Sequence, residues 1–264
     1  ISGSGLLAVF KAPRPLAQAQ VARACEAGIV SAWLAHSGLK GYGNILEEGF
    51  LPAFCDEYHL DLVGRDLAKV YMIPETYIKL HGGCRHIHAP IDATLHIANE
   101  HRIAIDDIEQ VRVKTYSITL DLDIDNPQTS DEARFNIPFA ISLALVFGTA
   151  SVDRFTDDNL KNERIQKLMG RIIVEHDAEL DKEYPAKRGT IVEVSTRDGQ
   201  TFSHRLDFAK GEPESPLSQS EIVNKFKYLT SGVISTQASA TIIHLVNRLE
   251  ALDDACELLA QLGA

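Results

Sequence analysis

The chain lacks the signals that mark membrane, secreted and disulfide-stabilised proteins. Its 264 residues contain no apolar run approaching the ~18 residues of a membrane span, and no basic-then-apolar signal peptide. The four cysteines form no CxxC pair and lie far apart, at Cys25, Cys55, Cys84 and Cys256. Scattered cysteines in a chain of this size fit a reducing compartment better than a disulfide scaffold. We therefore expect a cytoplasmic protein with no membrane partner.

An excess of basic residues is also lacking. The formal net charge is −11, from 26 lysines and arginines against 37 aspartates and glutamates. Because phosphate binding needs a basic surface, this balance argues against nucleic acid as a partner. An anionic small molecule would need a local basic pocket in such an acidic protein.

The motifs of the common nucleotide-binding, zinc-protease and serine-hydrolase sites are absent too. The sequence contains no P-loop, no GxGxxG, no GxSxG and no HExxH. We therefore expect a protein that works without a bound cofactor.

The densest group of reactive side chains lies between residues 79 and 88. Six of these ten residues are cationic, titratable or nucleophilic: Lys79, His81, Cys84, Arg85, His86 and His88. They flank the Gly82-Gly83 pair and lead into a predicted helix, whose free N–H groups and dipole favour anions. The stretch therefore predicts an anion-binding site, with a solvated polar loop as the alternative.

Two other chemistries are compatible with this stretch. His88, Asp92 and His96 recur every four residues, so they share one helix face and could hold a metal. Without HExxH or paired-cysteine spacing, a solvated helix face is the stronger interpretation, and we predict no metal site. Cys84 has cationic neighbours at a helix start and could be a nucleophile, although a packing cysteine is the simpler interpretation.

The spacing of apolar residues predicts the secondary structure. Helices are expected at 16–37, 84–101, 133–147, 218–226 and 238–262, and strands at 70–80, 108–120, 171–176, 189–195 and 201–206. Thr129 and Ser218, each followed three residues later by glutamate, predict capping boxes for the helices at 133–147 and 218–226. Asp198-Gly199 predicts a hairpin turn between the last two strands.

The order of these elements predicts an α+β fold. A mixed block at 79–208 separates two helical segments, 1–78 and 209–264. Helical segments on either side of an inserted block are expected to pack together. We therefore expect a partial, discontinuous helical domain with an inserted α+β lid domain.

Several stretches resemble segments of the MmgE/PrpD family, in the same order. The core is Lys79-x8-His88, with Cys84-Arg85 inside it and Ala89-Pro-Ile-Asp92-Ala after it. Further resemblances lie at 2–6, 28–38, 132–140 and 211–226. The family includes 2-methylcitrate dehydratase, cis-aconitate decarboxylase and iminodisuccinate epimerase, which act on small polycarboxylates by proton abstraction next to a carboxylate. The resemblance implies a large helical domain, a smaller α+β lid and a dimeric assembly.

The resemblance also implies roles for the 79–88 stretch. Lys79 and His88 are the implied catalytic residues, and Lys79, His81, Cys84 and Arg85 the implied substrate-binding residues. The implied activity is that of a lyase, a hydro-lyase similar to 2-methylcitrate dehydratase, acting by general acid–base dehydration or a related proton abstraction. Neither a metal nor another cofactor is implied.

Two features depart from the family pattern. The chain begins with isoleucine, and the N-terminal part of the family's helical domain has no counterpart in it. Ala17 and Gln20 stand where the resemblance places a lysine and a histidine. We therefore expect a homodimer, or a heteromer with a chain that supplies the missing helical half. The alternative is a non-catalytic structural or regulatory half of such a heteromer.

Overall fold

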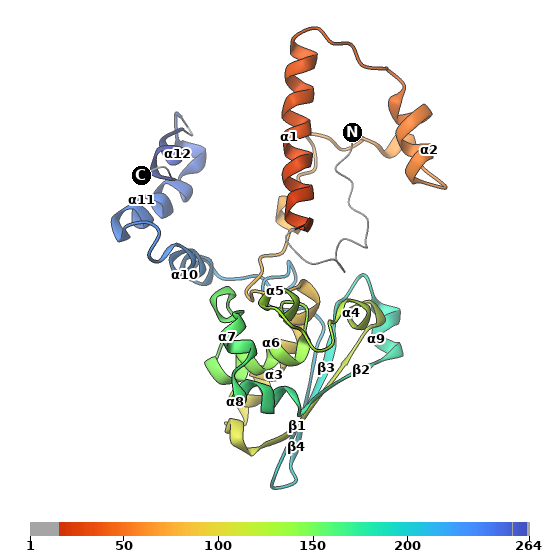
Figure 1. The fold of residues 1–264 in the computed structure, drawn as a ribbon. Helices are drawn as coiled ribbons and strands as arrows, with labels where there is room; N and C mark the ends of the chain where they lie inside the picture. Colours follow the sequence, from red (N-terminus) through yellow and green to blue (C-terminus); the bar gives the residue numbers. More distant parts are fainter. Residues whose placement is uncertain (1–15, 255, 263–264) are drawn as a thin grey trace.

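The computed structural model, which describes residues 16–254 and 256–262, contains a four-stranded sheet in the lower part of the view in Figure 1. In the order β2-β1-β3-β4, the strands are Ile172–His176, Ile108–Thr115, Thr190–Thr196 and Thr201–Leu206. β1 pairs in parallel with β2 and antiparallel with β3, while β3 and β4 form the predicted hairpin. The mixture of helices with this sheet confirms the predicted α+β class.

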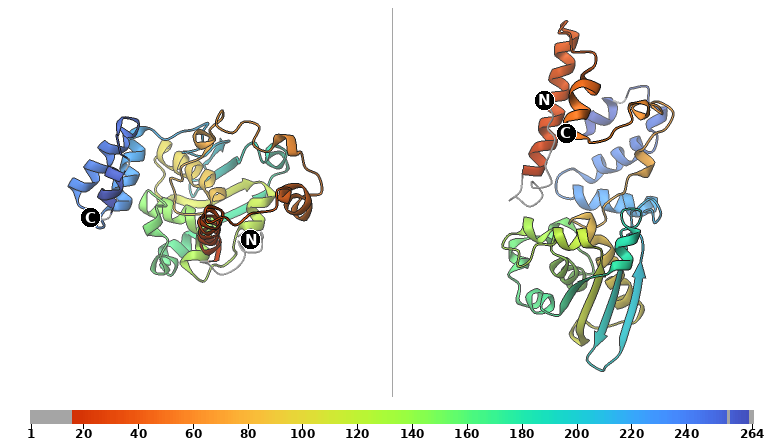
Figure 2. Two further views of the ribbon diagram at one scale, coloured as in Figure 1. Left: turned by 90° about the horizontal axis from the view of Figure 1, so that it is seen from above. Right: turned by 90° about the vertical axis from the view of Figure 1, so that its right-hand side faces the viewer.

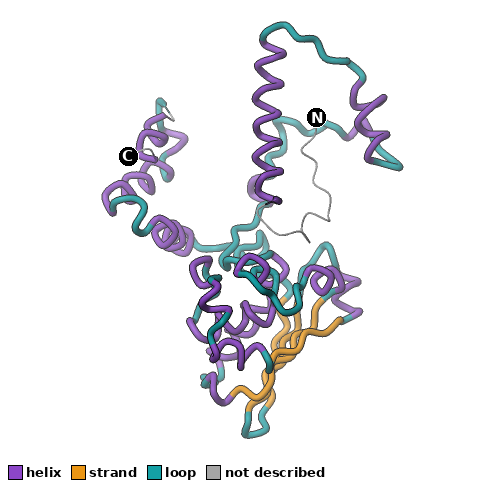
Figure 3. The backbone as a smooth tube through the Cα atoms, in the orientation of Figure 1, coloured by secondary structure: helices purple, strands orange, loops and turns teal. Residues whose placement is uncertain are grey.

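Side chains alternate along the strands, so one face of the sheet is buried and the other is exposed. The buried face presents valines of β1 and β3: Val111, Val113, Val192 and Val194. Two helices pack on that face, α3 (His88–Glu100) against β3 and β4, and α6 (Ile137–Phe147) against α3 and β2 (Figure 3). On the other face, Lys114 Nζ lies 2.8 Å from Glu193 Oε1.

Helix α6 fills the core beside α3. Its fully buried side chains include Phe139, Ile141 and Leu143. The helix begins four residues later than predicted, because Pro138 stands in its first turn and Asn136 caps it. The Asn136 side-chain oxygen accepts a hydrogen bond from the Phe139 N–H at 2.7 Å. Thr129 instead caps the separate short helix α5 (Ser130–Ala133). The first predicted cap is therefore present, but it starts a different helix.

Shorter helices complete this α/β module (residues 85–206). They are α4 (Ser117–Leu122), α7 (Asp157–Leu160), α8 (Glu163–Met169) and α9 (Ala178–Glu183). The strand predicted over 108–120 ends at Thr115, so its last residues were wrongly assigned. The Ser117 N–H and hydroxyl both donate to Asp181 Oδ1, at 2.8 and 2.9 Å, and α4 starts there. A contact with a distant residue therefore overrides the local β-pattern.

The strand predicted at 70–80 was wrong. This segment contains a short 3₁₀ turn, Ile73–Glu75, and otherwise runs as irregular backbone. Pro74 removes one backbone donor, and no strand of the described sheet lies beside the segment. The Ile78 N–H instead donates to the Gly211 carbonyl at 2.9 Å. The segment is therefore tied to the 209–215 loop and not to the sheet.

Helical arms extend away from the α/β module (Figure 2). They are α1 (Leu16–His36), α2 (Leu51–Phe54), α10 (Gln219–Thr230), α11 (Thr236–Val246) and α12 (Cys256–Leu262). The capping box at Ser218 is present as predicted. On α1, Val21, Ile29 and Trp33 are 66%, 56% and 69% exposed. The division into a discontinuous helical domain and an inserted lid stays a prediction.

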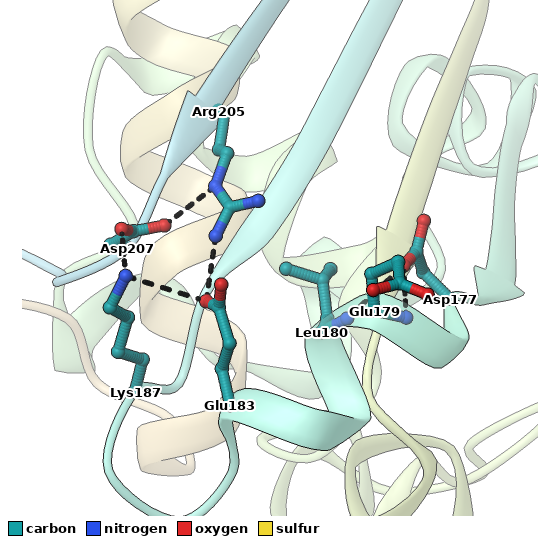
Figure 4. Close-up of polar contacts among 7 residues, drawn as sticks. All are labelled: Asp177, Glu179, Leu180, Glu183, Lys187, Arg205 and Asp207. Carbon is teal, nitrogen blue, oxygen red and sulfur yellow. Dashed lines mark hydrogen bonds and ion pairs between the residues drawn. The ribbon is translucent and has the colours of Figure 1, made fainter.

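A charged network ties α9 to the end of β4 (Figure 4). Asp207 accepts from Lys187 Nζ and from Arg205 Nε, both at 2.7 Å, and Arg205 Nη2 also reaches Glu183 at 2.6 Å. The four side chains are 30 to 42% exposed, so each pair contributes at most about 1 kcal/mol. Collectively these contacts anchor the segment between α9 and β3.

The carboxyl group of Asp123 is expected to destabilise the protein at neutral pH. It accepts from the Ile137 N–H at 3.1 Å, and burial raises its pKa from 3.8 to about 6. A raised pKa in the folded state means that stability is lost as the pH rises towards 6 and above. We expect Asp123→Asn to stabilise by about 1–3 kcal/mol at pH 7.5 and to be nearly neutral at pH 4, in urea denaturation. An equal effect at both pH values would contradict this.

Candidate active site

The Gly82-Gly83 turn is held closely by two other segments. The Gly82 N–H donates to the Ala150 carbonyl and the Cys84 N–H to the Arg134 carbonyl, both at 2.8 Å. A Cβ on Gly82 would lie 2.5 Å from Cα of Val152, which is too close for any other residue. The turn and the side chains around it are therefore fixed relative to α5 and α6.

A cavity of about 610 Å³ opens beside this turn. Its charged lining consists of Lys79, Arg85, Arg134 and Arg188, and His86 lines it as well. None of the described residues that line it is acidic, although the whole chain carries a net charge of −11. We call it the cationic cavity. It is the local basic pocket that an anionic ligand requires in this protein.

Three of the predicted site residues meet in the cationic cavity. Lys79, Cys84 and Arg85 all line it. Lys79 Nζ donates to the Gly83 carbonyl at 3.2 Å, which holds the ammonium group over the turn. Cys84 is a half-buried free cysteine on the same wall. This part of the sequence-based site is therefore spatially coherent.

The guanidinium of Arg85 already has a carboxylate partner. Its Nε donates to Glu212 Oε1 at 2.7 Å and its Nη2 donates to the second oxygen of the same group. Its central carbon also lies 4.0 Å from the centre of the Tyr77 ring. The Glu212 side chain is only 7% exposed, so this is a largely buried pair. Arg85 therefore joins the 77–85 segment to the 209–215 loop besides lining the cavity.

The other two predicted residues, His81 and His88, lie in the interior. His81 Nε2 is 2.8 Å from Asp92 Oδ1, and the second oxygen of Asp92 accepts from the Lys210 N–H at 2.8 Å. His88 is 2% exposed, and burial, with smaller contributions from His81 and Lys79, lowers its pKa to about 3. Neither histidine is among the residues that line the cationic cavity. Their assignment to the site stays a prediction.

A second cavity of about 550 Å³ lies between this turn and α10. It shares Lys79, Gly82 and Gly83 with the cationic cavity, and His81 lines it. Lys225 also lines it, and its Nζ donates a hydrogen bond to the Lys79 carbonyl. The pKa of Lys225 is lowered, mainly by burial and also by the nearby charge of Lys79. The exposed surface of its lining is mainly apolar and the acidic Glu221 is part of it, so this cavity suits carboxylates less well than the cationic cavity does.

Sequence reasoning missed two arginines of the cationic cavity. Arg134 follows α5, and its Nη1 donates to the Gly82 carbonyl at 3.1 Å. Arg188 follows α9, with its Nη1 on the Pro185 carbonyl at 3.2 Å and its central carbon 5.5 Å from the Tyr184 ring. Arg134 lies within the 132–140 stretch that resembles the family, and this resemblance was a signal that could have pointed to it as a site residue. Arg188 has no comparable signal in the sequence.

The helix face considered for a metal is divided between two separate side-chain contacts. Asp92 contacts His81, whereas His96 Nε2 lies 2.9 Å from Glu100. Within residues 16–254 and 256–262, no three His, Cys, Asp or Glu side chains are grouped to hold a metal ion. Over the same residues, no helix has the length and apolar character to cross a bilayer.

Comparison with known proteins decides the family. The sequence model described as the MmgE/PrpD C-terminal domain matches residues 81–251. The chain belongs to the MmgE/PrpD family. The match begins at His81, next to the Gly82-Gly83 turn, and runs through the whole α/β module, α10 and α11 to Ala251. The family resemblance of the chain is thereby confirmed, and the match covers 81–92 of the 79–92 stretch, starting two residues after Lys79.

Relatives of this MmgE/PrpD chain are decarboxylases by name. It is 27% identical to a cis-aconitate decarboxylase-like protein of Aspergillus oryzae over 262 residues, or 91% of this chain and 53% of the relative. It is 24% and 25% identical to the cis-aconitate decarboxylases of Mus musculus and Homo sapiens, over 97% of this chain and 55% and 56% of theirs. The chain therefore spans about half the length of these relatives.

Proposed function

We propose that this MmgE/PrpD chain is part of a lyase-type enzyme for a small polycarboxylate of the 2-methylcitrate or cis-aconitate class. The observation that carries the proposal is the cationic cavity, whose four cationic side chains have no acidic neighbour in the lining. Clustered arginine and lysine groups bind carboxylates strongly, and arginine can do so with two parallel hydrogen bonds. The names of the relatives support the same substrate class.

The proposed chemistry starts with removal of a proton next to a carboxylate. The negative charge then spreads onto that carboxylate, so fixed cations that face it lower the barrier. We assign Lys79, Arg134 and Arg188 to holding the carboxylates, because all three line the cavity. In a dehydration, the electron pair left by that proton expels hydroxide from the neighbouring carbon. In a decarboxylation, carbon dioxide leaves in place of the proton, its electron pair stays on the carbon skeleton, and a proton then adds there.

The remaining predicted residues have supporting roles in this proposal. Cys84 and Arg85 contribute walls of the cavity. His88 has a backbone hydrogen bond with Gly83, whose carbonyl also accepts from Lys79 Nζ. His88 is thus proposed to act on the ligand through the position of Lys79. The His81–Asp92 pair is proposed to act through His88, whose ring centre lies 5.1 Å from that of His81.

The proposed enzyme includes a further helical part. A homodimer, or a heteromer with a chain that supplies the missing helical half, would cover apolar side chains that α1 exposes, such as Trp33 and Ile29. Light-scattering mass of the purified protein, alone and co-expressed with such a helical part, tests it. A stable monomer in both cases would contradict it.

Substitution of Lys79 tests the catalytic proposal. With the complementary helical part present, Lys79→Met is expected to lower kcat/KM for cis-aconitate or 2-methylcitrate by about 100-fold, because one charge that stabilises the transition state is lost. Lys161→Met, which changes an exposed lysine, is the matched control. Unchanged turnover of every polycarboxylate in Lys79→Met would contradict the proposal. Binding without turnover in the wild-type assembly would favour the non-catalytic alternative.

A further inference from the structure

A histidine outside the predicted catalytic set lines the cationic cavity. His86 Nδ1 lies 2.6 Å from the hydroxyl oxygen of Tyr116. The Tyr116 side chain is 1% exposed and stacks on Tyr184 at 4.8 Å between ring centres. Because one ring nitrogen of His86 is held by a fixed, buried phenol, its imidazole has a defined orientation at the cavity wall.

The surroundings of His86 keep its imidazole neutral. Burial, followed by the charges of Arg188, Arg85 and Lys79, lowers the pKa of His86 to about 4. Burial raises the pKa of Tyr116, so the phenol keeps its proton. The other polar groups of the same cavity, from the elements packed around it, are Tyr77, Cys84, Arg134 and Tyr184. Near pH 7 this site therefore pairs a neutral imidazole with a neutral phenol.

The hydrogen bond between these two rings determines where the imidazole proton resides. A phenol O–H is a stronger donor than an imidazole N–H, and an imidazole nitrogen is a stronger acceptor than a phenol oxygen. The Tyr116 O–H therefore donates to His86 Nδ1, and the imidazole proton resides on Nε2. Nε2 is the nitrogen left for the ligand, and a carboxylate in the cavity further favours an N–H at that position.

We propose that His86 is a neutral hydrogen-bond donor to a ligand carboxylate, through Nε2–H, and that Tyr116 is the positioning residue that sets this tautomer. The inference rests on the proposed function, since it takes the ligand to be a polycarboxylate. A neutral imidazole N–H can stabilise charge that develops on an oxygen without first losing a proton to it. His86 thereby adds a directional donor to the charges of Lys79, Arg134 and Arg188.

The tautomer can be measured without any ligand. In the full chain with ¹⁵N-labelled histidine, the ring nitrogen shifts of His86, assigned with His86→Gln, are expected to report a neutral Nε2–H form from pH 6 to 8. Tyr116→Phe keeps the ring stacking and removes the donor, so the shifts should move towards a mixture of tautomers. An Nδ1–H form or an imidazolium at pH 7 in the wild type would overturn the proposal.

Binding of citrate tests the donor itself. We expect His86→Leu to weaken citrate binding about 10-fold in calorimetry, and His86→Gln, which keeps an N–H near the Nε2 position, only about 3-fold. His244→Leu, on the exposed side of α11, is the matched control. If His86→Leu binds citrate normally while Lys79→Met does not, the proposal fails and the proposed function stands. If the wild type binds no polycarboxylate, the proposed function fails, and with it the donor role of His86.

Discussion

Gly211→Ala is expected to lower the free energy of unfolding by about 4 kcal/mol, because two penalties coincide at this position. The backbone has φ +96°, which an L-residue adopts only with strain. A Cβ at this position would also overlap the carbonyl oxygen of Ile78. The substitution would therefore separate Ile78 from Gly211 and break the hydrogen bond from the Ile78 N–H.

Gly199→Ala is the matched control for this prediction. Gly199 has a similar φ of +84°, but a Cβ there would meet no atom within 4 Å. Gly199→Ala should therefore lower the free energy of unfolding only by the backbone strain, about 1–2 kcal/mol. Urea denaturation of both variants isolates the close contact at Gly211. Equal losses of stability in the two variants would show that the 78–211 contact contributes nothing.

Arg85→Met is expected to cost about 3–5 kcal/mol of folding stability, because it leaves a buried carboxylate without its partner. Glu212 is 6% exposed, and the Arg85 guanidinium supplies two of its hydrogen bonds. The double variant Arg85→Met/Glu212→Met should lose less than Arg85→Met alone, since no charge then remains buried. Chemical denaturation of the single and double variants measures the difference.

Arg205→Met is the control for that experiment. Arg205 also contacts two carboxylates, on Asp207 and Glu183, but its side chain is 42% exposed. Its loss should therefore cost no more than about 2 kcal/mol for the two exposed pairs together. If Arg85→Met costs as little as Arg205→Met, the Arg85–Glu212 pair is not structural. Any ligand-binding measurement on Arg85→Met would then report the cavity directly.

Several elements could be predicted because their signals are local. The β3–β4 hairpin follows from two alternating runs around Asp198-Gly199, and Ser218 with Glu221 forms the predicted capping box. Local signals also failed in identifiable ways. The 70–80 segment has a β-like composition, yet Pro74 and the lack of a neighbouring strand in the described structure leave it irregular. Whether a segment forms a strand depends on a neighbouring strand that pairs with it, and the sequence of the segment alone does not show whether such a neighbour exists.

By itself, the sequence determined the α+β class, the family and the position of the Lys79–Arg85 part of the cationic cavity. These depend on periodicity and on residues close together in the chain. Only the tertiary structure decided that Arg134 and Arg188 complete the cavity. It also decided that Glu212 forms an ion pair with Arg85, and that Tyr116 forms a hydrogen bond with His86. Tyr116 is 30 residues from His86 in the sequence, and Glu212 is 127 residues from Arg85. Such contacts depend on how the sheet, α3 and the loops pack, and no local pattern records them.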